Sequence, residues 1–186
     1  RKDVNLTCDL GILKINLPII SSPMDTITEH TMVEAMHRHG GLGIIHRYNT
    51  IQHQVEMINQ LGEEVNIGAA IGVSGDYLDR ATALYDAGVR ILCVDIAHGH
   101  HILMRNALSE LRNIFGFTVH LMAGNVATLQ GFNDLADWGA DSIRVGIGGG
   151  SICSTRLIAG HGVPSLSSII NCAKTDRDAV LIADGG

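Results

Sequence analysis

Residues 142–155 read SIRVGIGGGSICST, a short apolar run that enters a glycine-rich loop carrying a cysteine. Glycine accepts a positive φ at little cost, so such a loop can curl around an anion or a cation. Cys153 lies among Ser, Thr and Gly rather than among aliphatic residues, which favours an exposed, stabilised thiolate over a small apolar filler. The stretch therefore predicts a strand whose carboxyl end leads to a ligand-binding loop with a nucleophile.

Short aliphatic runs alternate with apolar residues at helical spacing along the rest of the chain. The runs predict strands at 17–21, 43–46, 66–71, 90–95, 118–122, 141–145 and 180–183. Helical patterns lie between them, at 31–39, 52–61, 77–87, 103–114, 129–138 and 165–173. Thr28 is the expected cap of the first helix, and Gly40, Gly88 and Gly139 are expected to follow helix ends. This alternation indicates parallel βαβ units in an α/β fold.

Polar groups follow several of these strands: Ser22 and Asp25, His46, Asp95, Asn125, the loop from Gly146, and Asp184. Active sites of (β/α)₈ barrels gather at the carboxyl ends of the strands, so this distribution favours a TIM barrel over a doubly wound sheet. The patterns give about seven strands, and an open barrel of that size would leave two unpaired edges. We therefore expect residues 1–186 to be a single barrel domain, present as an incomplete fragment truncated at both ends.

The composition and charge of the chain limit the partners and the cellular setting that we expect. The net charge is −6 with few basic clusters, which argues against a nucleic-acid partner or an anionic membrane surface. The apolar runs are too short to span a bilayer. The four cysteines are widely spaced, which favours a reducing, cytoplasmic setting over a disulfide framework, with Cys93 and Cys172 in aliphatic surroundings.

The residues of the glycine loop permit two kinds of ligand. Ser151 and the amides of residues 148–152 are suited to a phosphate, because N–H groups in glycine loops point at anions. The carbonyls of the same loop are equally suited to a monovalent cation. The spacing alone leaves both possibilities open.

The other strand-end groups also have two interpretations each. Asp184 is suited to the neighbouring hydroxyls of a ribose, or belongs to a plain turn. Asp95 is expected to be functional rather than only a helix cap. His98, His100 and His101 lack a clear pattern of co-ligands and are more typical of polar surface groups than of a metal site.

Six segments together resemble the IMP dehydrogenase/GMP reductase family. They are SSPMDT at 21–26, GGLGIIH at 40–46, VDIAHGH at 94–100, AGNVAT at 123–128, residues 146–156, and IADGG at 182–186. They run in family order across nearly the whole chain. The resemblance implies a (β/α)₈ barrel that binds a purine 5′-monophosphate, IMP or GMP, and a nicotinamide cofactor, NAD or NADPH.

The resemblance also implies a role for each matching residue. Cys153 would attack purine C2, and Thr155 would assist at that carbon. The substrate would be bound by Ser22, Met24, Arg144, Ser151, Asp184 and Gly186. The cofactor would meet Asp95, Ile96, Ala97, Asn125 and Gly146, and the carbonyls of Gly148, Gly150 and Cys153 would hold K⁺, as in the dehydrogenases. A cytoplasmic homotetramer is the implied assembly of the full-length protein.

The segments at 22–29 and 150–153 favour an NAD-dependent IMP dehydrogenase, although no CBS regulatory pair separates His46 from Asn66. Gly149 and Ser154 differ from the residues that are commoner at these positions of the loop in the family. This difference weakens the resemblance at the cation site. The alternatives are an NADPH-dependent GMP reductase and a catalytically silent nucleotide-binding barrel. An unrelated phosphate-binding isomerase would not need Cys153 beside the loop. The fragment itself is predicted to be inactive.

Overall fold

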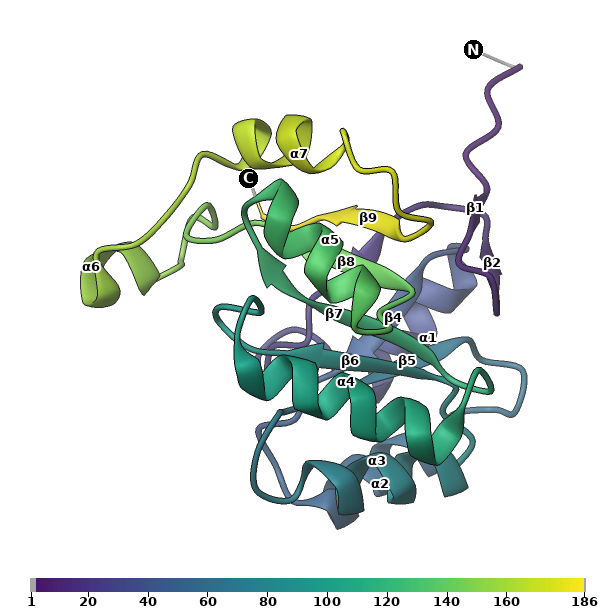
Figure 1. The fold of residues 1–186 in the computed structure, drawn as a ribbon. Coiled ribbons are helices and arrows are strands. Elements are labelled where there is room, and N and C mark those ends of the chain that lie inside the picture. Colours follow the sequence, from purple (N-terminus) through teal and green to yellow (C-terminus); the bar gives the residue numbers. More distant parts are fainter. Residues whose placement is uncertain (1–2, 186) are drawn as a thin grey trace. The chain divides into compact units, whose positions relative to one another are not determined.

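The computed structural model describes residues 3–185 and shows an α/β fold in which seven parallel strands form one sheet (Figure 1). The strands are β3 (Ile20–Ser21), β4 (Leu42–Ile45), β5 (Ile67–Ile71), β6 (Ile91–Asp95), β7 (His120–Val126), β8 (Ser142–Val145) and β9 (Val180–Ala183), in that order along the sheet. At least one helix follows each strand from β3 to β8. This is the order of a (β/α)₈ barrel with fewer than eight units, so the predicted fold class is confirmed.

The helices are α1 (His30–Arg38), α2 (Ile51–Asn59), α3 (Tyr77–Asp86), α4 (Ile102–Phe115), α5 (Leu129–Asp137), α6 (Thr155–Ala159) and α7 (Ser165–Cys172). Within residues 3–185, no helix has the length and hydropathy that a membrane crossing requires. The chain divides into two units: one runs to Cys93 and includes Thr118–His120, and the other holds the remaining residues from Val94 onward.

The first unit is built around the buried strands β4 and β5. Gly43 of β4 faces α1 so closely that a Cβ there would lie 2.7 Å from Cα of Val33. The glycine therefore lets helix α1 pack directly against the strand. A short antiparallel hairpin, β1 (Cys8–Asp9) with β2 (Lys14–Ile15), precedes this core.

A buried arginine joins α2 and α3 in the same unit. Arg80 donates to Oε1 of Gln54 at 2.8 Å and to Oδ2 of Asp76 at 2.9 Å. Gln54 in turn donates to the carbonyl of Ala70 in β5, at 3.0 Å. Since a buried charge is tolerated only when it is paired and hydrogen-bonded, these contacts fix both helices against the strand.

The second unit packs α4 and α5 over the later strands. Leu108 and Leu111 of α4 and Phe132 of α5 are fully buried. Strands β7 and β8 pair in register up to Gly124, opposite Arg144; the next pair is Val126 with Val145. Asn125 is thus a bulge at the carboxyl end of β7, a feature that re-aims a side chain.

The amino ends of β7 and β8 are held by a second arginine. Arg112 donates to the carbonyls of Gly139, at 2.9 Å, and Gly116, at 2.8 Å, and forms an ion pair with Asp141. Oδ2 of Asp141 also accepts from the amide of Leu121, at 2.7 Å. This network ties the end of α4 to the start of both strands.

Four local features differ from the sequence-based predictions. The hairpin β1–β2 and helix α6 were not predicted, and β7 extends four residues beyond the expected end at Met122. Thr28 does not cap α1; the cap position is Glu29, and the buried Thr28 hydroxyl donates to the Ser22 carbonyl at 2.6 Å. The expected helix-ending glycines are confirmed, because Gly40, Gly88 and Gly139 all have positive φ.

Candidate functional site

Arg144 lies at the centre of a charged cluster at the carboxyl ends of the strands in the second unit. Its Nη1 donates to Oδ1 of Asp95 at 3.1 Å, and its Nη2 donates to Oδ2 of Asp184 at 2.9 Å. The Arg144 side chain is 9% exposed, whereas those of Asp95 and Asp184 are 21% and 24% exposed. The cation is therefore buried beneath two carboxylates that solvent or a ligand can reach.

Asn125 joins this cluster through the bulge of β7. Its Nδ2 donates to the Gly146 carbonyl at 2.8 Å and to Oδ2 of Asp184 at 2.5 Å. Its backbone is fixed by Ile96 and Gly99, since its amide donates to the Ile96 carbonyl at 3.0 Å and its carbonyl accepts from Gly99 at 2.6 Å. Oδ1 of Asn125 is buried without a hydrogen-bond partner among residues 3–185. Such an acceptor calls for a donor that a ligand can supply.

Gly146 is required for this arrangement. Its φ is 153°, and a Cβ at this position would lie 2.1 Å from the carbonyl oxygen of Asp184. No other residue permits this approach without displacing the end of β9. The glycine thus sets the spacing between the start of the loop and the Asp184 backbone.

The rest of the glycine loop packs against two later segments of the same unit. A Cβ on Gly149 would lie 2.1 Å from Oγ of Ser165, the first residue of α7. A Cβ on Gly185 would lie 3.3 Å from the amide nitrogen of Gly150. The loop therefore lies close to α7 on one side and to the chain after Asp184 on the other.

Cys153 follows the loop directly. Its amide donates to the Gly150 carbonyl at 3.1 Å, and its thiol donates to Oγ1 of Thr155 at 3.3 Å. Hydrogen bonding to the Thr155 side chain lowers the pKa of the Cys153 thiol, with smaller contributions from the Thr155 amide and the Arg156 charge. The hydroxyl can rotate to donate to the thiolate, which favours the nucleophilic form.

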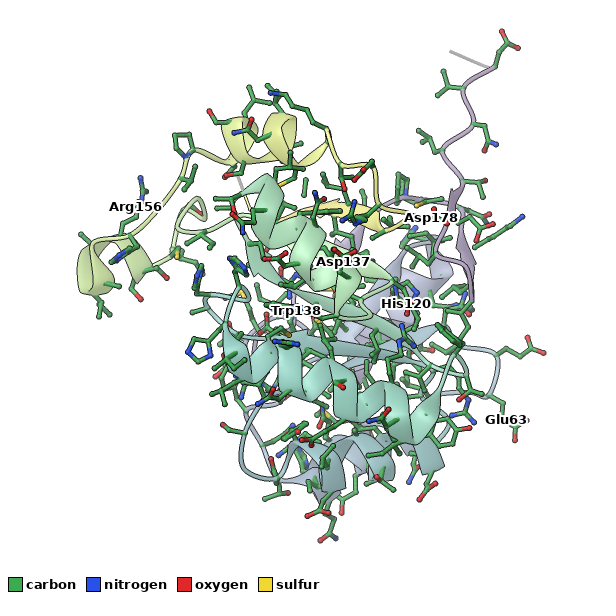
Figure 2. The ribbon with its side chains drawn as sticks, in the orientation of Figure 1. Glu63, His120, Asp137, Trp138, Arg156 and Asp178 are labelled. Carbon is green, nitrogen blue, oxygen red and sulfur yellow. The ribbon has the colours of Figure 1, made fainter. Side chains whose placement is uncertain are left out.

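Helix α6 begins two residues after this cysteine and lies away from the packed core. Figure 1 shows α6 beyond the carboxyl ends of β8 and β9, and Figure 2 labels Arg156 there, far from Asp137 and Trp138 at the end of α5. Leu157 and Ile158 of α6 are 90% and 82% exposed. Cys153 itself is partly exposed.

The histidines after β6 have an aspartate and one another as neighbours. No group of three or more possible metal ligands is found within residues 3–185. Nε2 of His100 instead lies 2.7 Å from Oδ2 of Asp134 on α5. Burial lowers the pKa of His98, and His100, His101 and His161 lower it further by repulsion. These residues behave as a local polar cluster.

Ser22 and Met24 belong to the first unit, where they form a tight turn before α1. The Ser22 carbonyl accepts from the Met24 amide at 2.8 Å, and the Met24 carbonyl accepts from the amides of Ile27 and Thr28, both at 3.0 Å. The side chains of Ser22 and Met24 are half-buried.

The structure brings the predicted residues of the second unit into two groups. One contains Asp95, Ile96, Asn125, Arg144, Gly146 and Asp184. The other contains Gly148, Gly150, Cys153 and Thr155. Ala97 and Ser151 are exposed beside these groups, and Gly186 lies outside the described residues.

Sequence reasoning did not identify two contributors. Arg156 supports the Cys153 thiolate by its charge, and Gly185 makes the close approach to Gly150. A basic residue three positions after the cysteine, at the start of a helix, was the available signal for Arg156. The ion pairs of Arg144 were not foreseen either, although an arginine among strand-end aspartates suggests them.

Several known proteins have sequences similar to that of this chain. The pattern of the family described as "IMP dehydrogenase / GMP reductase domain" matches residues 1–186. An inosine-5′-monophosphate dehydrogenase of Nitrosopumilus maritimus is 49% identical over 124 residues, which cover 64% of this chain and 25% of the relative. That of Cryptosporidium parvum is 33% identical over 220 residues, covering 94% of this chain and 54% of the relative.

A relative with another name is equally similar. A GMP reductase of Leishmania major is 49% identical over 123 residues, covering 64% of this chain and 25% of the relative. The chain thus spans from a quarter to about half of the length of these relatives. Since the family pattern covers the chain from residue 1 to residue 186, the chain belongs to the IMP dehydrogenase / GMP reductase family.

Proposed function

We propose that the full-length protein oxidises IMP to XMP with NAD, through a covalent intermediate on Cys153. The observation that carries this proposal is the accessible thiol at the end of the glycine loop, with Oγ1 of Thr155 at 3.3 Å and a lowered pKa. A catalytically silent nucleotide-binding barrel would have no use for an activated thiol. The residues that meet it here are a hydroxyl and a cation, which stabilise a thiolate.

The chemistry follows from the thiolate. Cys153 Sγ adds to C2 of the purine, and the electron pair of the C2–H bond leaves as hydride. When bound, the nicotinamide dinucleotide supplies the hydride acceptor. Water then adds at C2 and the C2–S bond breaks, which returns the thiolate and gives XMP with loss of one proton. The Thr155 hydroxyl donates to sulfur whenever the sulfur carries negative charge.

The glycine loop and Asp184 would orient the nucleotide. Arg144 and Asn125 both donate to Oδ2 of Asp184, and Oδ1 accepts no hydrogen bond within residues 3–185. A ribose hydroxyl is the natural donor to that oxygen. Ser151 and the loop amides would hold the phosphate, with Ser22, Met24 and Gly186 as further contacts expected from the resemblance. Binding at several such points converts attack at C2 into an effectively intramolecular step.

The residues beside Asn125 fit a nicotinamide dinucleotide. The buried, unpartnered Oδ1 of Asn125 is suited to a carboxamide N–H₂ group. Ile96 and Gly146 are hydrogen-bonded to Asn125, and Asp95 and Ala97 flank Ile96 in the chain. The carbonyls of Gly148, Gly150 and Cys153 are oxygen ligands of the kind that K⁺ prefers. A bound K⁺ would supply charge that holds the loop together. We assign these groups to the cofactor and the cation.

GMP reductase is the second candidate, because the Leishmania major relative of that name is as identical to this chain as the Nitrosopumilus maritimus dehydrogenase. In this reaction Sγ adds to C2 of GMP, and the amino group takes up one proton and leaves as ammonia; a hydride delivered to C2 then breaks the C2–S bond and releases IMP and the thiolate. Both reactions need the same cysteine adduct. NADPH would then be the cofactor in place of NAD.

An assay of the full-length protein separates the candidates. We expect IMP with NAD to yield XMP, detected by chromatography, and GMP with NADPH to yield no IMP. Turnover of GMP alone would contradict the first proposal and establish the second. Turnover of neither, with nucleotide binding retained, would favour the silent barrel. Light scattering on the same sample tests the expected homotetramer.

A further inference from the structure

Arg144 connects two carboxylates that come from different strand ends. Asp95 ends β6, and Asp184 follows β9, while Arg144 itself lies on β8. The guanidinium uses a different nitrogen for each partner, Nη1 at 3.1 Å and Nη2 at 2.9 Å. With a side chain that is 9% exposed, it lies beneath both acids instead of projecting into open solvent.

A guanidinium in this position constrains both acids at once. It stays protonated throughout the physiological range, and its planar fork fixes the direction of each hydrogen bond. Oδ2 of Asp184 is held by Arg144 and also by Asn125, which leaves Oδ1 for another donor. Without Arg144, the two carboxylates would lose the cation that they share, and each would turn toward solvent.

We propose that Arg144 is a positioning residue that couples the binding of the purine nucleotide to the binding of the dinucleotide. It acts through Asp184 on the nucleotide side and through Asp95 on the cofactor side. This inference rests on the proposed function. It also changes the interpretation of Arg144 from the sequence, where a direct contact with substrate was expected.

The coupling has a simple physical origin. A nucleotide hydroxyl bound to Asp184 withdraws charge from that carboxylate and alters its hold on the guanidinium. The guanidinium then shifts its bonding toward Asp95, and the dinucleotide meets a more firmly fixed acid. By linkage, the dinucleotide strengthens nucleotide binding by the same factor.

Arg112 provides a matched control in the same unit. It too is mostly buried, at 13% side-chain exposure, and it is ion-paired with an aspartate, Asp141. Its partners lie at the amino ends of the strands, where the proposed ligands do not bind. Loss of the guanidinium fork at Arg112 should therefore cost stability as the loss at Arg144 does, but should leave the coupling between the two ligands intact.

The experiment measures binding by calorimetry in the full-length protein with Cys153→Ala, which prevents turnover. The Kd of IMP is determined with and without saturating NAD, in proteins carrying Arg144→Lys, Asp95→Asn or Arg112→Lys. With Arg144 present, we expect NAD to tighten IMP binding about tenfold. Arg144→Lys keeps the charge but not the fork, and should bring this factor close to one. Arg112→Lys should leave it unchanged.

Asp95→Asn offers a second route, because it leaves Arg144 in place and removes one arm of the bridge. It should also abolish most of the coupling, even if Arg144→Lys folds poorly. Full coupling in either variant would overturn the inference while leaving the proposed reaction intact. A parent protein that binds neither IMP nor GMP would overturn the proposed function together with the inference.

Discussion

The two ends of strand β8 each place a buried arginine beside an aspartate, yet they differ in what they leave unsatisfied. At the amino end, Arg112 bonds two backbone carbonyls and Asp141, and Asp141 also accepts from the Leu121 amide. At the carboxyl end, Oδ1 of Asn125 is buried without a partner in the described part of the chain. An ion pair alone does not show whether a cluster serves stability or function. A buried hydrogen-bond acceptor without a partner beside the pair indicates function.

The largest expected effect is on activity at the carboxyl end. Cys153→Ala should lower turnover by about 10⁴-fold or more, because the covalent step has no substitute nucleophile. The thermal midpoint should hardly change, since the side chain is partly exposed in a loop. Steady-state assays with mass spectrometry for the adduct measure this.

Cys172→Ala is the control for that variant. Cys172 is fully buried, and burial raises the pKa of its thiol. The Cys172→Ala substitution should therefore lower the stability of the fold and leave the activity unchanged. An adduct on the Cys153→Ala protein would contradict the assignment of the nucleophile.

Arg112→Met tests the opposite end. Removing the guanidinium leaves Asp141 without its ion-pair partner, and we expect a loss on the order of 3 kcal/mol in the free energy of unfolding. The Kd of IMP, measured well below the unfolding transition, should be unchanged. Urea denaturation gives the first quantity and calorimetry the second. A weakened Kd with unchanged stability would erase the distinction between the two ends.

Thr155→Val should have a smaller, pH-dependent effect. Hydrogen bonding to Thr155 holds the pKa of the Cys153 thiol below its ordinary value, so the thiolate forms at lower pH than it would otherwise. Valine removes the hydroxyl and should move the pH profile of iodoacetamide alkylation upward, slowing the reaction at pH 7 by a few-fold, roughly. An unshifted profile would show that Thr155 does not support the thiolate.

The smallest effect is expected for the exposed pair of Asp137 and Arg177. Hydrogen bonding to Arg177 lowers the pKa of Asp137 in the folded state. The pair therefore stabilises the fold above the ordinary Asp value of 3.8 and loses this contribution as pH falls through the lower, folded value. Asp137→Asn should lower the thermal midpoint slightly at pH 7 and not at strongly acidic pH. Because the pair is exposed, added salt should reduce even this difference.

The sequence predicted strands and helices well where periodicity was strong. Helices α3 and α5 agree with their patterns to within a residue at either end. It did not predict α6, because five residues carry too little periodicity, nor the extension of β7 through Asn125. Thr28 was assigned as a cap because hydroxyls favour that position, but its buried side chain found the Ser22 carbonyl instead.

The residues that carry the chemistry of the site could also be predicted from the sequence, but the contacts between them could not. Asp95, Asn125 and Asp184 were recognised as strand-end groups, which the parallel sheet gathers at one edge. That Arg144 pairs with both acids depends on a β8 side chain that points toward the carboxyl end. The close approach of the Asp184 carbonyl to Gly146 depends on the positive φ of Gly146. A glycine in the sequence permits this φ but does not predict it.

The different environments of the cysteines have a practical consequence for labelling. Cys93 and Cys172 are buried, whereas Cys153 is accessible and has a lowered thiol pKa. A maleimide dye added at slightly acidic pH should thus react first at Cys153, and replacement of Cys8 would remove the other partly exposed thiol. A fluorophore attached there would report directly on whatever enters or leaves the glycine loop.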